Sequence, residues 1–99
     1  MNDSHDKHSR PDYKWPSIAV AWADSAPDTS HRFEAARTIC AVYGLDIYEV
    51  DRVADLLALA LRRKALTEDY KDGGVDGQYY WPTLADIDTQ MCVIGTRIG

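Results

Sequence analysis

The sequence of 99 residues contains few of the side chains on which metal centres, redox sites and disulfide frameworks are built. It has two cysteines, Cys40 and Cys92, and three histidines. Neither cysteine has a second cysteine or a histidine near it at zinc-site spacing. We therefore expect both to be buried thiols in a reducing compartment, and the sequence predicts no metal site and no disulfide framework.

Long apolar runs are also missing. The longest, residues 56–61, is far shorter than the roughly 20 residues that cross a bilayer. The first residues of the chain are polar and contain no signal-peptide core. We therefore expect a soluble, cytoplasmic protein that has no membrane partner.

Motifs for catalysis and cofactor binding are absent. The glycines at 73–74 precede an acidic segment instead of a capped helix with a lysine, so they do not form a phosphate-binding loop. A calcium loop beginning at Asp69 would place Tyr80 where the twelfth residue must be glutamate. Nothing marks His31 as a catalytic partner of Cys40. The sequence therefore predicts a protein that is not an enzyme and needs no cofactor.

Positive charge is scarce. Lysine and arginine number 11 against 16 aspartates and glutamates, which gives a net charge of -5. Between residues 68 and 88 the only basic residue is Lys71, and the acidic residues there are Glu68, Asp69, Asp72, Asp76, Asp86 and Asp88. Affinity for nucleic acid comes largely from lysine and arginine neutralising phosphates. We therefore do not expect direct nucleic-acid binding, and the acidity favours a basic protein as partner.

Helical patterns are abundant, above all in residues 46–66. Asp46 and Glu49 have the spacing of a capping box, and Leu45 and Val50 have the spacing of a hydrophobic staple. The segment that follows is apolar on almost every side in its middle turns, so this helix requires neighbours around most of its circumference. A second copy of the chain in a homodimer is one source of such neighbours.

Three further helices are predicted around this one. Gly44 ends the second helix as a left-handed residue, and Thr83 and Asp86 form a capping box at the start of the last. The predicted fold class is all-α: a single domain over residues 15–99, after a flexible arm at 1–14, with about four helices near 17–24, 30–43, 46–67 and 83–94.

An α+β fold is the alternative, with short strands at 18–22 and 79–81. Ile18, Val20 and Trp22 alternate with alanines as they would in a strand. The pentapeptide at 15–19 resembles the one at 81–85, however, and this similarity suggests that the first segment is also helical and is capped by Ser17.

Aromatic residues cluster with the acidic segment, and together they form the candidate binding surface. Tyrosine and tryptophan contribute most to interface energetics, so exposed rings beside carboxylates are typical of a recognition surface. In the alternative interpretation, Trp81 and one tyrosine close the hydrophobic core. The predicted partner-binding residues are Asp69, Asp72, Asp76, Tyr79, Tyr80 and Trp81.

These features predict a small acidic regulator or inhibitor that acts by protein–protein binding on a basic, nucleic-acid-binding protein. Small acidic inhibitors from phages and mobile elements, among them some anti-CRISPR proteins, imitate the phosphates of nucleic acid, and the analogy here is one of charge and size. The alternative is a transcriptional regulator with a helix-turn-helix around Gly44. Asp46, Glu49 and Asp51 would then face the DNA phosphates, which favours a helical hairpin used only for packing.

Overall fold

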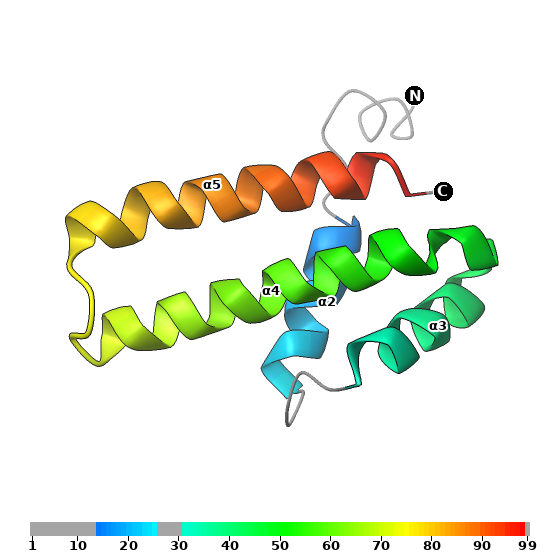
Figure 1. Ribbon diagram of the computed structural model, residues 1–99, viewed down its shortest axis with the longest axis horizontal. Helices are drawn as coiled ribbons and strands as arrows, with labels where there is room; N and C mark the ends of the chain where they lie inside the picture. The colour runs from blue at the N-terminus through cyan, green and yellow to red at the C-terminus, as the bar shows by residue number, and fades with distance from the viewer. Residues whose placement is uncertain (1–13, 26–30, 99) are drawn as a thin grey trace, which may run out of the picture.

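The computed structural model describes residues 14–25 and 31–98 and contains α-helices but no strand in these ranges (Figure 1). The all-α prediction is confirmed. The alternative strands at 18–22 and 79–81 are wrong, because both segments lie within helices. Of the predicted arm, residues 1–13 lie outside the described residues, and Lys14 belongs to a helix. The elements in chain order are α2 (Lys14–Ser25), α3 (Arg32–Tyr43), the 3₁₀ helix η1 (Ile47–Glu49), α4 (Val50–Lys71) and α5 (Gly77–Thr96).

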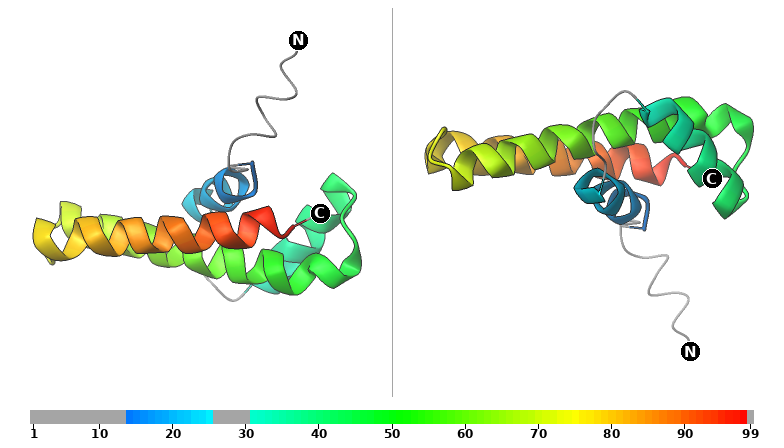
Figure 2. Two further views of the ribbon diagram at one scale, coloured as in Figure 1. Left: turned by 90° about the horizontal axis from the view of Figure 1, so that it is seen from above. Right: turned by 90° about the horizontal axis from the view of Figure 1, so that it is seen from below.

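Helix α4 is the centre of the fold, as its apolar pattern predicts. It packs against each of α2, α3 and α5, and the buried hydrophobic side chains of the described residues form one cluster around it. Helices α4 and α5 form a long antiparallel hairpin, and α2 lies on one side of the layer that they make (Figures 1 and 2). The molecule is flat, with extents of 43 × 35 × 18 Å. Figure 1 shows that the end of the hairpin with the α4–α5 turn projects beyond α2 and α3.

Asp46 is a cap as predicted, but it caps the 3₁₀ helix η1 that precedes α4. The N-cap residue of α4 is Glu49, whose side chain makes no cap hydrogen bond. The Oδ1 of Asp46 accepts a hydrogen bond of 3.1 Å from the backbone amide of Tyr48, which begins the 3₁₀ helix η1. The carboxylate of Glu49 accepts a hydrogen bond of 2.8 Å from Arg52. The α-helix proper begins at Val50 and continues to Lys71, beyond the predicted end at residue 67.

The predicted start of the last helix at Thr83 is wrong. Asp76 is the cap, because its carboxylate accepts a hydrogen bond of 3.0 Å from the backbone amide of Tyr79. Helix α5 therefore contains Pro82, whose nitrogen has no hydrogen to donate to the carbonyl of Gln78 and whose ring crowds that carbonyl. Packing of the apolar face against α4 outweighs that loss.

Helix α2 also begins earlier than predicted. Residues 14–16 are already helical, so Ser17 is not the cap. The ring of Trp15 is buried and meets the ring of Tyr43 edge to face, with the centroids 5.3 Å apart. The ammonium of Lys14 lies 4.7 Å from the centre of the Trp15 ring and 5.2 Å from that of Tyr43. These contacts join the beginning of α2 to the end of α3.

Gly44 ends α3 as predicted. Its φ of 70° and ψ of 27° place it in the left-handed region, where a side chain would be strained. The amide of Leu45 donates a hydrogen bond of 2.8 Å to the carbonyl of Cys40, and the amide of Gly44 donates one to Ala41. These bonds satisfy carbonyls at the end of the helix and turn the chain back along α4.

Candidate functional site

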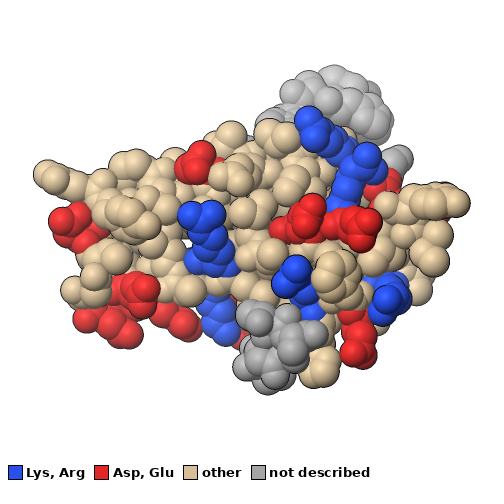
Figure 3. Space-filling view, in the orientation of Figure 1, with Lys and Arg blue, Asp and Glu red and all other residues tan. Residues whose placement is uncertain are grey.

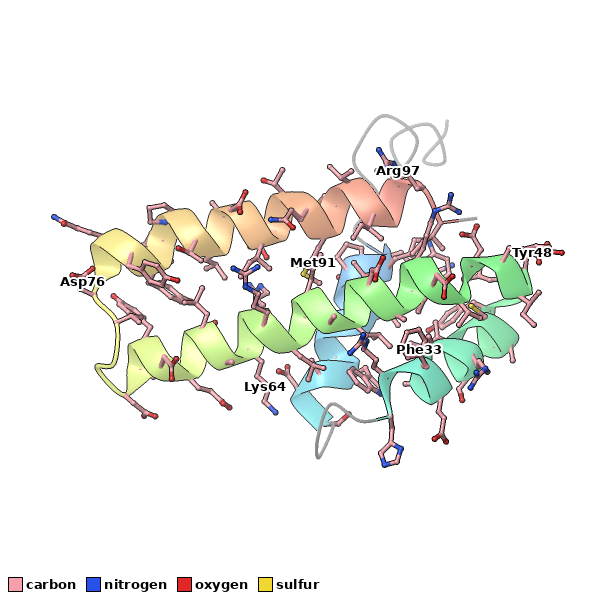
Figure 4. All side chains as sticks on the ribbon, viewed as in Figure 1. Phe33, Tyr48, Lys64, Asp76, Met91 and Arg97 are labelled. Atoms are coloured by element: carbon pink, nitrogen blue, oxygen red, sulfur yellow. The ribbon has the colours of Figure 1, made fainter. Side chains whose placement is uncertain are left out.

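The structure places the predicted partner-binding residues at one end of the molecule, which we call the hairpin tip and define as residues 68–82. Asp69 lies near the end of α4, Asp72 at its C-cap and Asp76 at the N-cap of α5. These three carboxylates are exposed, as are the rings of Tyr79 (54%) and Trp81 (58%). Figure 4 shows Asp76 at the extreme end of the hairpin.

Tyr80 is an exception, and its predicted role in an exposed surface is wrong. Its side chain is only 5% exposed and belongs to the hydrophobic core. The helix places Tyr79 and Trp81 on outward-facing sides and turns Tyr80 toward α4. The alternative interpretation is therefore right that one tyrosine closes the core, but Trp81 does not join it there.

Three aromatic rings pack against one another at the tip. Tyr70 of α4 and Tyr80 of α5 lie parallel, with centroids 4.1 Å apart and planes inclined by 5°. Trp81 meets both edge to face, at 4.7 Å from Tyr80 and 5.8 Å from Tyr70. The hydroxyl of Tyr80 lies 3.3 Å from that of Thr67. The exposed face of Trp81 is therefore supported from behind by a fixed aromatic cluster.

The turn between the helices is short and hydrogen-bonded. Gly73 has a φ of 79°, which favours glycine, and its amide donates a hydrogen bond of 3.1 Å to the carbonyl of Tyr70. The amide of Gly74 donates one of 2.7 Å to the carbonyl of Asp69. These bonds fix the relative positions of Asp69, Asp72 and Asp76 around the turn.

The tip is strongly acidic. Acidic side chains gather at the end of the hairpin in the space-filling view, below and beside the turn (Figure 3). Glu68, Asp69, Asp72 and Asp76 lie in the tip, and Lys71 is its single basic residue. The ion pairs among the described residues all lie outside the tip; they are His31–Glu34, Arg52–Glu49 and Arg63–Asp88. The carboxylates of the tip therefore face solvent.

Two further acids of the same sequence segment are not part of the tip. Asp88 accepts a hydrogen bond of 2.8 Å from the Nε of Arg63, and Asp86 accepts one of 3.0 Å from Gln90. Both lie further along α5. The acidic run in the sequence is thus divided in space, and only its first four acids form one surface.

A small hollow of about 230 Å³ lies between α4 and α5 beside the tip. Asp69 and Tyr79 line it, together with Arg62 and apolar side chains of both helices. The hollow therefore carries one acidic and one basic side chain.

A larger groove of about 820 Å³, which the sequence did not reveal, lies between α2 and α5. Ser17, Val20 and Ala21 line it from α2, and Thr89 and Val93 line it from α5. No motif marks these residues, because the groove arises only when α2 crosses the hairpin.

The two cysteines differ. Cys40 is 3% exposed, as predicted, and its burial, with a smaller contribution from the negative charge of Glu49, raises the pKa of its thiol above the ordinary value of 9.0. Cys92 is only half-buried, and it lines the groove. Within residues 14–25 and 31–98, no group of three or more His, Cys, Asp or Glu side chains is arranged to hold a metal ion.

The structure thus defines the class of protein as a small all-α bundle built on a helical hairpin. Comparison of the chain with models of known protein families, with curated proteins and with solved structures gave no match. Among the helices of the described part of the chain, none combines the length and the apolar character that crossing a membrane requires.

Proposed function

We propose that the protein is a small non-catalytic regulator or inhibitor that binds a basic protein through the hairpin tip. The observation that carries this proposal is the position of exposed rings among solvent-facing carboxylates at a projecting end of the molecule. Tyr79 and Trp81 supply the rings, and Asp69, Asp72 and Asp76 supply the charge.

The rigidity of the tip supports a binding role. Association costs free energy when side chains and loops become ordered at an interface. Here the Tyr70–Tyr80 stack already holds Trp81, and backbone hydrogen bonds already hold the turn. Little ordering remains to be done when a partner binds. A large ring held in this way is a typical centre of interface energetics.

The charge of the tip supports a partner whose natural ligand is nucleic acid. Such proteins present lysines and arginines that neutralise phosphates. Several carboxylates on a short, fixed turn offer those cations an alternative set of negative charges, as a phage or mobile-element inhibitor of the anti-CRISPR kind does. On this proposal the protein competes with nucleic acid for its binding protein.

The helix-turn-helix alternative is less well supported. Helices α3 and α4 do meet at Gly44, and α3 buries Ala36, Ile39 and Cys40 in the core. The first turns of α4, which would approach DNA, carry the exposed acids Asp51 and Asp55, and phosphates would repel both.

Affinity capture from the source cell, with three forms of the chain as bait, tests the proposal. The first is the wild type, and the second, the tip variant, carries Asp69→Asn, Asp72→Asn and Asp76→Asn. Asparagine is a good N-cap, so the substitution at Asp76 keeps the start of α5. The matched control removes the same number of charges from exposed residues outside the tip, with the substitutions Asp51→Asn, Asp55→Asn and Asp86→Asn.

A basic nucleic-acid-binding protein should be captured by the wild type and the control and be lost from the tip variant. Added nucleic acid should release it from the wild type. Equal capture of the same proteins by the tip variant and the wild type would contradict a binding role for the tip.

A further inference from the structure

One face of α2 has a charge pattern that is complementary to itself. Lys14, Ser17, Ala21 and Asp24 follow one another at intervals of three, four and three residues, so they form one stripe along the helix. All four are exposed, whereas Ala19 and Ala23 are buried against the rest of the protein. A cation stands at one end of the stripe, an anion at the other and two small residues between them.

The stripe borders the groove of about 820 Å³ between α2 and α5. Ser17, Ala21 and Asp24 line this groove on the α2 side, and Thr89 and Val93 line it on the α5 side. Small side chains at Ser17 and Ala21 allow another helix to approach closely. As the described residues form it, the groove has space for a helix lying alongside α2.

We propose that this face binds the same face of a second copy of the chain, with the two α2 helices antiparallel around a two-fold axis near Ala19. In this arrangement Lys14 of each copy lies opposite Asp24 of the other, and Ser17 lies opposite Ala21. A two-fold interface requires such self-complementarity, and the two ion pairs form at symmetric positions. In an antiparallel pair, the positive N-terminal end of each helix dipole lies beside the negative C-terminal end of the other, which is favourable.

The shape of the molecule agrees with this arrangement. It is only 18 Å thick, and α2 stands on one side of the α4–α5 layer (Figure 2). In the dimer, the α2 helix of each copy enters the groove of the other, so that two hairpin layers enclose the pair.

Lys14 contacts residues of its own chain and, in the proposed dimer, also contacts Asp24 of the second copy. Its ammonium lies over the rings of Trp15 and Tyr43. A cation–π contact engages the charge through the ring faces, and an ammonium has three hydrogen atoms to donate. The carboxylate of Asp24 from the second copy approaches the same ammonium.

The dimer is independent of the binding role proposed for the tip. Its residues lie on α2 and the C-terminal half of α5, whereas the tip is residues 68–82. The dimer displays two tips. Oligomeric state and partner capture are separate measurements, so each proposal can fail alone.

Charge reversal tests the interface in the full chain, by sedimentation equilibrium over a range of concentrations. Lys14→Asp places two carboxylate pairs face to face across the axis, and Asp24→Lys places two ammonium pairs there. Each single variant should weaken the dimer about tenfold or more, because two symmetric pairs change from attraction to repulsion. In a mixed dimer of the two variants, both facing pairs again combine a carboxylate with an ammonium, because one copy carries carboxylates at positions 14 and 24 and the other copy carries ammoniums there. An equimolar mixture should therefore associate more tightly than either variant by itself.

Asp55→Lys is the matched control, since Asp55 is an exposed acid of α4 that does not line the groove. It should leave dimerisation unchanged, and circular dichroism should show that all variants keep their helices. Ala21→Arg, at the centre of the stripe, should abolish the dimer. A wild-type chain that is monomeric at every concentration would overturn the proposal. So would a dimer that survives Lys14→Asp, Asp24→Lys and Ala21→Arg.

Discussion

The rings of Tyr70 and Tyr80 lie parallel, 4.1 Å apart, across the turn that joins α4 to α5. This contact closes the hydrophobic core at the end of the hairpin where α2 and α3 no longer cover it. It also fixes the ring of Trp81, which touches both tyrosines and presents an exposed face. The same aromatic cluster therefore closes the core through Tyr70 and Tyr80 and presents the exposed ring of Trp81 on the candidate binding surface.

Substitutions at Tyr80 should separate the two contributions of its side chain. Tyr80→Phe removes the hydroxyl contact with Thr67 and should lower the free energy of unfolding by about 1 kcal/mol. Tyr80→Ala also removes the stacked ring and should cost about 3 to 5 kcal/mol. Tyr79→Ala is the control, and its ring is exposed, so it should cost less than about 0.5 kcal/mol. Urea unfolding followed by circular dichroism measures all three, and equal losses at Tyr79 and Tyr80 would contradict this assignment.

Gly44 and Gly77 should respond to alanine in opposite directions. At Gly44 a Cβ meets no atom within 4 Å, but the φ of 70° is unfavourable for alanine, so Gly44→Ala should cost about 1 to 2 kcal/mol. Gly77 is the first residue of α5, and a Cβ there makes an ordinary contact of 3.5 Å with Trp81. Gly77→Ala should stabilise the protein by about 0.5 kcal/mol. Thermal unfolding that shifts downward for both would refute this difference.

The Arg63–Asp88 ion pair should contribute little to stability, despite its length of 2.8 Å. Both side chains are partly exposed, at 32% and 47%, so solvent screens their attraction. Asp88→Asn should therefore lower the free energy of unfolding by less than about 1 kcal/mol. A loss of several kcal/mol, measured by urea unfolding at low and high salt, would show that the pair is more important than its exposure indicates.

Cys40 should make stability decrease at alkaline pH. Its pKa is raised in the folded state, so the folded protein holds the thiol proton more tightly than the unfolded chain does. This contribution is fully present below the ordinary pKa of 9.0 and is lost as the pH rises through the folded-state pKa. The free energy of unfolding, measured from about pH 7 to about pH 11, should fall less steeply in Cys40→Ala than in the wild type. Parallel curves would contradict the assignment.

Local signals predicted much of the fold. Gly44 ends α3 as predicted, and Asp46 is a cap as predicted, although it caps η1 and not α4. Both roles depend on immediate neighbours in the sequence. The start of α5 differs from the prediction because Thr83 and Asp86 have capping-box spacing, whereas the Asp76 cap and the core contact of Tyr80 begin the helix earlier. A local cap at Asp76 and the core packing of Tyr80 together set that boundary.

The candidate site was predictable only in part. The acidic residues near the turn are neighbours in sequence, so a hairpin brings them together whatever its exact register. The burial of Tyr80 depends on which side of α5 meets Tyr70, and the groove depends on how α2 crosses the hairpin. Neither feature can be read from the order of the residues alone.

The central claim is that the acidic tip binds a basic protein. Its most direct test is a calorimetric titration of the captured partner with the wild type, the tip variant and the matched control, at several salt concentrations. The wild type and the control should bind alike and more weakly as salt increases, and the tip variant should bind at least about tenfold more weakly with little salt dependence. A tip variant that binds as tightly as the wild type at every salt concentration would contradict the account.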